Sequence, residues 1–307
     1  FNLKTIFDNI KICKKDILEF KPDVLIFRDY PGFNMRIAKW AKTLGMKTHY
    51  YISPQIWAWK ESRITEIKRD IDKMYVILPF EKKFYEDKHH FPVEFVGHPL
   101  IDAIYNQPIV DPVLFRKENQ LNDKPIIAIL PGSRKQEITK MLAVMLSVVN
   151  DFPDHQFVIA GAPSQEFSFY QKFITQENIK FISNKTYDLL RNATAALVTS
   201  GTATLETALF KVPEVVCYKG SWASYQIAKR IITLKYISLV NLIMDEEVVT
   251  ELIQEECNTK RIREELQKTL KTNDRNTLLE KYALLEEKLG GIGASEKTAT
   301  LIVNDLK

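Results

Sequence analysis

Two short loops in the second half of the chain carry residue types that bind phosphate. The first is "LPGSR", where an apolar run at 126–130 leads into Gly132, Ser133 and Arg134 before a polar, helix-like segment. The first amides of a helix lack partners and carry positive partial charge, and an arginine grips a phosphate with a planar fork. A plain strand-to-helix turn with Ser133 as N-cap explains the same residues equally well, so this motif alone leaves both interpretations open.

The second loop is "VTSGTATLE" at 198–206, where another apolar run ends in Ser200, Gly201 and Thr202. Gly201 permits close approach of the backbone, and the hydroxyls can donate to phosphate oxygens. Glu206 falls four residues after Thr202 on the same face of the predicted helix, where it could accept hydrogen bonds from a sugar. Ser-Gly-Thr caps are common, yet two such turns in one half-chain strengthen the case for each. Neither loop matches the Walker pattern or G-x-G-x-x-G, which disfavours an ordinary P-loop or dinucleotide site.

In the first half of the chain, three polar residues follow predicted strands. Asp29 in "FRDYPGFN" could accept a proton from a substrate hydroxyl, although such an aspartate more often caps the next helix. Ser53 begins "SPQIWAWK", whose two tryptophans form either an aromatic wall or part of the core. His98 lies in "VGHPL", where a lone histidine is more often structural.

Strand-like and helix-like segments alternate along the chain, which predicts an α/β fold with parallel sheets. Residues 102–124 lose this periodicity and collect prolines, which places a linker there. Two α/β halves predict two domains with a cleft between them, and ligands bind such sheets at the carboxyl ends of the strands. From residue 245 onward the pattern is almost entirely helical. The predicted strands lie at 23–27, 47–52, 73–78, 93–96, 126–130, 156–160, 179–182, 195–198 and 214–218.

The composition is that of a soluble globular protein, with 307 residues of which 45% are hydrophobic and 27% charged. A net charge of +4 is too mild to indicate nucleic acid, and no basic and aromatic face recurs along any element. Cys13, Cys217 and Cys257 lie far apart without metal-ligand spacing, so we expect reduced thiols, no metal site and a cytoplasmic setting. No apolar run approaches the roughly 20 residues of a membrane-spanning helix.

Seven motifs occur in the order found in the lipid A disaccharide synthase family. They are "DYPGFN", "HYYISPQIWAWK", "LPFEKKFYE", "VGHPL", "LPGSRKQEI", "TSGTATLE" and "YISLVNLI…ELIQEEC". The chain therefore resembles that family from its first residues to about Cys257. The resemblance implies an inverting GT-B glycosyltransferase with two Rossmann-like domains facing a cleft. Residues 1–104 would form the acceptor-side domain, and residues 105–307, with the terminal helices, the domain that binds the nucleotide sugar.

The reaction implied by the resemblance joins UDP-2,3-diacylglucosamine to 2,3-diacylglucosamine 1-phosphate. It forms a β-1′,6 linkage with inversion, releases UDP and uses no metal or other cofactor. Asp29 matches the family's proposed general base, and Arg134 matches the arginine at the diphosphate. His98 and Ser53 are weaker matches. The matches to the rest of the UDP-sugar site are Gly132, Ser133, Ser200, Gly201, Thr202, Glu206, Asn241 and Gln254.

The chain departs from the family pattern in two places. The family's first strand and glycine-rich loop have no counterpart, which predicts a protein truncated at its N-terminus. Gly32 stands where the family often has an aspartate, so Asp29 is the only carboxylate in its motif. One alternative function is therefore a UDP-binding fragment with impaired catalysis. Another is a different UDP-N-acetylglucosamine-type GT-B enzyme, although such enzymes lack the pair "SPQIWAWK" and "VGHPL".

Acylated substrates require contact with a membrane surface, and two stretches combine an apolar stripe with basic residues. An amphipathic helix of this kind can lie on an anionic leaflet, although most such stripes face a core. We favour the membrane interpretation for the N-terminal helix and the core interpretation for residues 222–236. The first predicts a cytoplasmic protein attached peripherally to the inner membrane. The N-terminal stripe consists of Phe1, Leu3, Ile6, Phe7 and Ile10, with Lys4, Lys11, Lys14 and Lys15 close by.

Overall fold

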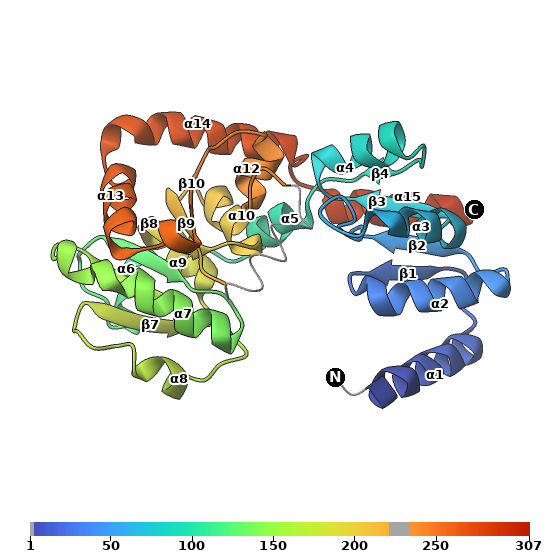
Figure 1. Cartoon of the computed structure of the whole chain (residues 1–307), viewed down its shortest axis with the longest axis horizontal. Helices are drawn as coiled ribbons and strands as arrows, with labels where there is room; N and C mark the ends of the chain where they lie inside the picture. Colours follow the sequence, from blue (N-terminus) through green and yellow to red (C-terminus); the bar gives the residue numbers. More distant parts are fainter. Residues whose placement is uncertain (1–2, 221–233) are drawn as a thin grey trace. The chain divides into compact units, whose positions relative to one another are not determined.

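The chain divides into two compact units, seen in a computed structural model that describes residues 3–220 and 234–307 (Figure 1). Unit 1 comprises residues 1–102 and 288–307, and unit 2 comprises residues 103–287. The sequence placed one boundary near residue 104 and kept the terminal helices with the second domain. Residues 288–307 instead belong to unit 1, so the expected second domain extends too far.

Unit 1 is built on a parallel sheet with the strand order β1-β2-β3-β4. Its strands lie at the predicted places, namely β1 (Leu25–Arg28), β2 (Thr48–Tyr51), β3 (Lys73–Val76) and β4 (Glu94–Phe95). Short helical turns occupy Glu61–Arg63 and Phe84–Lys88. The helices are α1 (Leu3–Phe20), α2 (Pro31–Thr43), α3 (Ile64–Asp70), α4 (Pro79–Lys83), α5 (Pro99–Tyr105, which runs into unit 2) and α15 (Ala294–Leu306).

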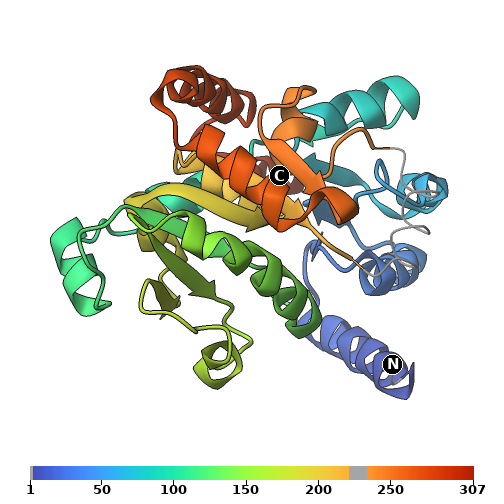
Figure 2. The same ribbon diagram turned by 60° about the vertical axis from the view of Figure 1, so that its left-hand side comes forward.

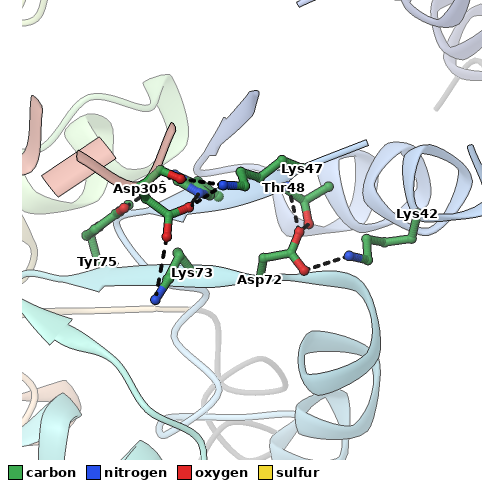
Figure 3. Close-up of polar contacts among 8 residues, drawn as sticks. Lys42, Lys47, Thr48, Asp72, Lys73, Tyr75 and Asp305 are labelled. Carbon is green, nitrogen blue, oxygen red and sulfur yellow. Dashed lines mark hydrogen bonds and ion pairs between the residues drawn. The ribbon is translucent and has the colours of Figure 1, made fainter. Parts of the chain in front are cut away.

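The alternation of side chains along β2 explains why α15 belongs to unit 1. Tyr50 packs into the core with residues of α2 and α3. The neighbouring His49 points to the other face, where its Nε2 lies 3.0 Å from the Asp305 carboxylate of α15. Lys47 and Lys73 also pair with Asp305, at 3.0 and 3.7 Å (Figure 3). The last helix therefore covers a sheet face that the first hundred residues leave open.

The start of α15 is fixed by a carboxylate from α5. The two oxygens of Asp102 accept hydrogen bonds from the backbone N–H groups of Gly293 at 2.7 Å and Ser295 at 2.8 Å. A carboxylate at this position satisfies amides that have no partner within the helix. The helix is thus held at both ends by residues of unit 1.

Unit 2 is built on a parallel sheet with the strand order β10-β9-β8-β5-β6-β7. Five of its strands were predicted: β5 (Ile126–Leu130), β6 (Gln156–Gly161), β7 (Ile179–Ser183), β8 (Ala193–Thr199) and β9 (Glu214–Tyr218). The expectation of an almost entirely helical tail is wrong at β10 (Thr250–Ile253), which pairs with β9. Four residues are too few to establish a period of two, and only the pairing with β9 reveals this strand.

Helices cover both faces of the unit 2 sheet, and β5 is buried on both sides. Ile127 and Ile129 pack in one core with α7 and α13, while Ala128 and Leu130 pack in a second core with α9. The unbroken apolar run "IIAIL" is what such a central parallel strand requires. Figure 2 shows α7 and α13 together on one side of the sheet. The helices are α6 (Pro112–Glu118), α7 (Lys135–Met145), α8 (Phe167–Gln171), α9 (Thr186–Asn192), α10 (Thr202–Leu209), α12 (Leu239–Met244), α13 (Thr259–Thr269) and α14 (Thr272–Lys288).

Within the described ranges, no helix is long and apolar enough to cross a bilayer. Of the second stretch considered for membrane contact, residues 222–233 lie outside the described residues.

Candidate functional site

The sheet order of unit 2 brings the two glycine-containing loops together. β5 and β8 are hydrogen-bonded neighbours, and the chain proceeds from β5 to β6 on one side and from β8 to β9 on the other. Such a reversal is where open α/β sheets bind ligands, beyond the carboxyl ends of the strands. The loops after β5 and β8 line one pocket of about 490 Å³. Its lining includes Gly132, Ser133, Arg134, Ser200, Gly201, Thr202 and Glu206.

The loop after β5 turns sharply into α7. Gly132 has a φ of 97°, in the region that favours glycine. Ser164 donates a hydrogen bond from Oγ to the Ser133 carbonyl at 3.1 Å, which ties the loop to the segment after β6. Arg134 is exposed at the N-terminal end of α7. The loop therefore presents the first amides of α7 and one guanidinium to the pocket.

The loop after β8 is held through a side chain as well. Ser200 donates from Oγ to the Ile237 carbonyl at 2.8 Å. Gly201 precedes α10 with a φ of 151°, and a Cβ built on it would meet nothing within 4 Å. Thr202 begins α10 and is exposed to the pocket. A side chain at position 201 would therefore project into the pocket and not into the protein, and glycine leaves that space to a ligand.

Glu206 projects from the second turn of α10, and a tyrosine orients it. The Tyr187 hydroxyl donates to Glu206 Oε1 at 3.3 Å. Burial raises the pKa of Glu206, an effect that this hydrogen bond opposes, and burial raises the pKa of Tyr187 to about 12. The sequence did not single out Tyr187. The one feature that could have indicated Tyr187 is its place at the start of α9, just beyond the carboxyl end of β7.

Asn241 and Gln254 lie outside this pocket. Asn241 is fully buried, and its Nδ2 donates hydrogen bonds to the Val249 carbonyl and the Glu251 carboxylate. Its Oδ1 accepts from the backbone N–H groups of Val248 and Val249. Glu251 in turn accepts from the N–H of Ile237, whose carbonyl holds Ser200. Asn241 therefore supports the backbone behind the pocket. Gln254 begins a short helical turn with a φ of 52°, and its Nε2 is buried without a partner among the described residues.

Asp29 lies in unit 1, in a strained turn directly after β1. Asp29 and Tyr30 have φ values of 51° and 43°, which cost a non-glycine residue energy. The Asp29 carbonyl accepts two hydrogen bonds of 2.6 Å, from the Tyr50 hydroxyl and the Asn34 side-chain amide. Its carboxylate is 62% exposed, with Arg28 Nε at 3.7 Å. The turn fixes the backbone and leaves the carboxylate accessible, an arrangement common at functional residues.

The two weaker candidates, Ser53 and His98, are buried residues of unit 1. Ser53 donates to Glu81 at 2.6 Å, and Trp57 donates to the same carboxylate oxygen. Burial raises the pKa of Glu81, which these donors oppose. His98 accepts a hydrogen bond from the Leu100 N–H, and burial lowers its pKa to about 4. Both contacts organise loops after strands.

No metal cluster is visible in the described part of the chain, where no three His, Cys, Asp or Glu residues could hold an ion together.

Comparisons with known proteins agree on a family and a fold. A sequence model described as lipid-A-disaccharide synthetase matches residues 2–301. The lipid-A-disaccharide synthase of Coxiella burnetii (strain CbuG_Q212) is 40% identical over 305 residues, covering 96% of this chain and 79% of that protein. The lipid-A-disaccharide synthase of Syntrophus aciditrophicus (strain SB) is 39% identical, covering 99% of this chain and 81% of that protein.

Solved structures resemble the fold at much lower identity. A UDP co-structure of MnaA from S. aureus has a TM-score of 0.70 and 14% identity, covering 99% of this chain and 82% of that one. A UDP-GlcNAc 2-epimerase from Neisseria meningitidis, bound to UDP-GlcNAc, has a TM-score of 0.61 and 13% identity, covering 98% and 81%. The glycotransferase of kitacinnamycin has a TM-score of 0.61 and 12% identity, covering 99% and 81%. At these identities the likeness describes the fold alone.

Proposed function

The chain belongs to the lipid-A-disaccharide synthetase family, and we propose how its residues carry out that family's reaction. The activity is that of a glycosyltransferase, which joins UDP-2,3-diacylglucosamine to 2,3-diacylglucosamine 1-phosphate and releases UDP. The anomeric carbon inverts, so a single displacement suffices. Such a displacement needs a site that stabilises the leaving UDP and a base that takes the acceptor's proton.

The pocket of unit 2 holds the UDP moiety. The observation that carries this proposal is the convergence of two loops, more than sixty residues apart in sequence, on one pocket at the strand reversal. The diphosphate lies against the first amides of α7, where Arg134 meets it with a planar pair of donors. Ser200 and Thr202 flank the same space from the second loop. Glu206, oriented by Tyr187, accepts hydrogen bonds from sugar hydroxyls.

The same groups assist departure of UDP. When the bond from the sugar to the diphosphate breaks, negative charge grows on the diphosphate oxygens. A guanidinium and helix-terminal amides that already point at those oxygens stabilise the charge without reorganisation. Arg134 is therefore expected to matter both for UDP affinity and for the rate of transfer.

Asp29 is the proposed general base. Its carboxylate is exposed, while hydrogen bonds to its own carbonyl hold the backbone in a strained turn. A carboxylate held in this way can accept the proton of the acceptor hydroxyl as the new glycosidic bond forms. His98 is less accessible than Asp29, because it is buried and its Nδ1 already accepts a hydrogen bond from the Leu100 N–H.

Replacement of Arg134 tests the UDP site. We expect Arg134→Ala to weaken UDP binding by about 1.5–3 kcal/mol, the usual value of a charge-assisted hydrogen bond. Arg134→Lys should restore part of this, since lysine keeps the charge and loses the fork. Arg263→Ala, which removes a 41% exposed arginine of α13 outside the pocket, is the matched control. Calorimetric titration giving wild-type UDP affinity for Arg134→Ala would remove Arg134 from the site.

Reversible membrane attachment through α1 is the proposed route to acylated substrates. The structure buries some apolar residues of this helix and exposes others. Ile10 and Ile17 pack against the core of unit 1, whereas Phe7 and Leu18 are each 50% exposed. Lys4, Lys11 and Lys15 are exposed and, at about 100° per residue, fall on the side of Phe7 and Leu18. Ile12 and Phe20 are also exposed but lie on other sides of the helix. Apolar and basic side chains on one surface suit an anionic leaflet.

Vesicle sedimentation tests the attachment, with phosphatidylglycerol vesicles as the probe. Phe7→Ser combined with Leu18→Ser should reduce binding to the vesicles at unchanged melting temperature. Ile10→Ser is the matched control on the inner face, and it should lower the melting temperature instead. Full sedimentation of the double variant would refute attachment through α1.

A further inference from the structure

The carboxylate of Glu137 folds back from α7 over the loop that precedes the helix. The Ser133 N–H donates a hydrogen bond to Glu137 Oε2 at 3.3 Å. A Cβ built on Gly132 would lie 2.3 Å from the same oxygen, so the carboxylate packs directly against the Gly132 backbone. Glu137 is also part of the pocket lining. A negative group of the protein itself therefore occupies the place where the loop amide would meet a phosphate.

Carboxylates commonly cap helix N-termini, so the contact alone indicates no ligand. The second observation is the hydroxyl of Thr199, at the end of β8. Thr199 is only 3% exposed and lines the same pocket, yet its Oγ1 has no hydrogen-bond partner among the described residues. A buried hydroxyl without a partner is unfavourable, and a bound polar group would satisfy it. Glu137 does not satisfy this hydroxyl, so within the described part of the chain the pocket has a polar group that only a bound ligand would pair.

We propose that Glu137 is an internal competitor of the UDP diphosphate. Its carboxylate holds the Ser133 amide while the pocket is empty, and it gives up that amide when the diphosphate binds. This inference rests on the proposed function of the pocket. Binding then carries two costs, the loss of the carboxylate's own hydrogen bond and the approach of like charges. The same contact favours release of UDP after transfer, because the carboxylate returns to the amide as the product leaves.

The role is one of tuning affinity for the anionic part of the ligand. Glu137 therefore differs from Arg134, which attracts the diphosphate. It also differs from Glu206, which lies on α10 and is proposed to accept hydrogen bonds from a sugar. Removing the negative charge of Glu137 should strengthen binding of any ligand that carries a diphosphate. It should leave binding of an uncharged nucleoside unchanged.

Titrations of UDP, inorganic pyrophosphate and uridine separate these contributions. For Glu137→Gln, which keeps a hydrogen-bond acceptor of the same size, we expect UDP and pyrophosphate to bind about tenfold more tightly, or about 1.4 kcal/mol. Uridine should bind as in the wild type. Glu280→Gln, on the exposed face of α14, is the control for the same change in net charge away from the pocket. Glu137→Ala serves as a second variant, and its melting temperature is measured to show that α7 is intact.

The outcomes distinguish the inference from the proposed function. If the wild type binds no UDP, or if Arg134→Ala binds it as well as the wild type, the pocket assignment itself fails. If Arg134→Ala weakens binding while Glu137→Gln leaves the dissociation constants for UDP and pyrophosphate unchanged or larger, only the inference fails, and Glu137 is a cap. A gain for uridine equal to that for UDP would also overturn it, since the competition would then not concern the diphosphate.

Discussion

Replacing Tyr50 by phenylalanine should slow transfer through an effect on the turn at Asp29. The Tyr50 hydroxyl is buried in the core of unit 1 and donates to the Asp29 carbonyl at 2.6 Å. Asn34 donates to the same oxygen. These two hydrogen bonds oppose the tendency of Asp29 and Tyr30 to leave their left-handed conformations, which cost of the order of 1–3 kcal/mol each. Phenylalanine preserves the packing and removes one of the two restraints.

The size of the effect follows from the hydrogen bond that is lost. A neutral hydrogen bond contributes about 0.5–1.5 kcal/mol net, so the turn loses roughly 1 kcal/mol of support while the bond from Asn34 remains. If that loss falls on the equilibrium between the strained and the relaxed turn, the ratio of the two forms falls about fivefold, and kcat should fall by up to about fivefold. UDP affinity should not change, because the pocket proposed for UDP lies in unit 2.

The assay needs a control that loses a similar hydrogen bond elsewhere in the same core. Tyr85 is equally buried, and its hydroxyl donates to the Pro54 carbonyl at 3.1 Å. Tyr50→Phe and Tyr85→Phe should lose similar stability in denaturant unfolding. Only Tyr50→Phe should lower kcat at saturating substrates. Equal losses of kcat in both variants, or an unchanged kcat in Tyr50→Phe, would refute the link between the turn and catalysis.

The remaining predictions concern Asp29, Tyr187 and Asp305. Asp29→Asn should lower transfer by about 10²–10⁴-fold at unchanged UDP affinity, and near-normal turnover in a transfer assay would show that the base lies elsewhere. Tyr187→Phe should shift the acid limb of UDP affinity to higher pH in calorimetry, because its hydrogen bond opposes the burial that raises the pKa of Glu206. A profile identical to the wild type would exclude this positioning role. Unit 1 should lose stability as the pH falls below about 6.5. Burial lowers the pKa of His49, and the hydrogen bond from Lys47 lowers that of Asp305. The unfolded chain therefore binds more protons than the folded one, and acid favours unfolding. Because Asp305 raises the pKa of His49, Asp305→Asn should lower that pKa further and make the loss of stability below about pH 6.5 steeper in hydrogen exchange of β2 and β3. A flatter profile than that of the wild type would contradict the assignment.

The parts of the fold that the sequence predicted depend on local patterns. The run "IIAIL" is apolar on both faces because β5 is central, and its length excludes a helix. The loops after β5 and β8 could be paired in advance, since strands in a parallel sheet present their carboxyl ends at one edge. Gly132 and Gly201 occupy backbone conformations with positive φ, which is why glycine marked both loops.

The parts that the sequence missed depend on contacts between distant segments. Nothing near Glu206 in the sequence indicates that Tyr187 donates to it. Ser53 was considered for the site because it follows a strand, yet only the fold shows that it satisfies the buried Glu81. Asn241 was assigned to the site by resemblance, whereas in the structure it is buried and supports the backbone behind the pocket. The pattern of α15 shows a helix with a buried stripe but does not show which sheet it covers.

The placement of α15 also affects the order in which the protein folds during synthesis. Residues 1–102 leave the ribosome before unit 2, but α15, which covers the sheet face carrying His49, is made only after the whole of unit 2. Unit 2 is continuous in sequence and can complete its core while that face is still bare. The part of unit 1 that is translated before unit 2 is therefore completed after it, and its open face is accessible to chaperones in the interval. Proteolytic cleavage between α14 and α15, where Gly290, Gly291 and Gly293 all have positive φ, would accordingly damage the N-terminal half of the chain.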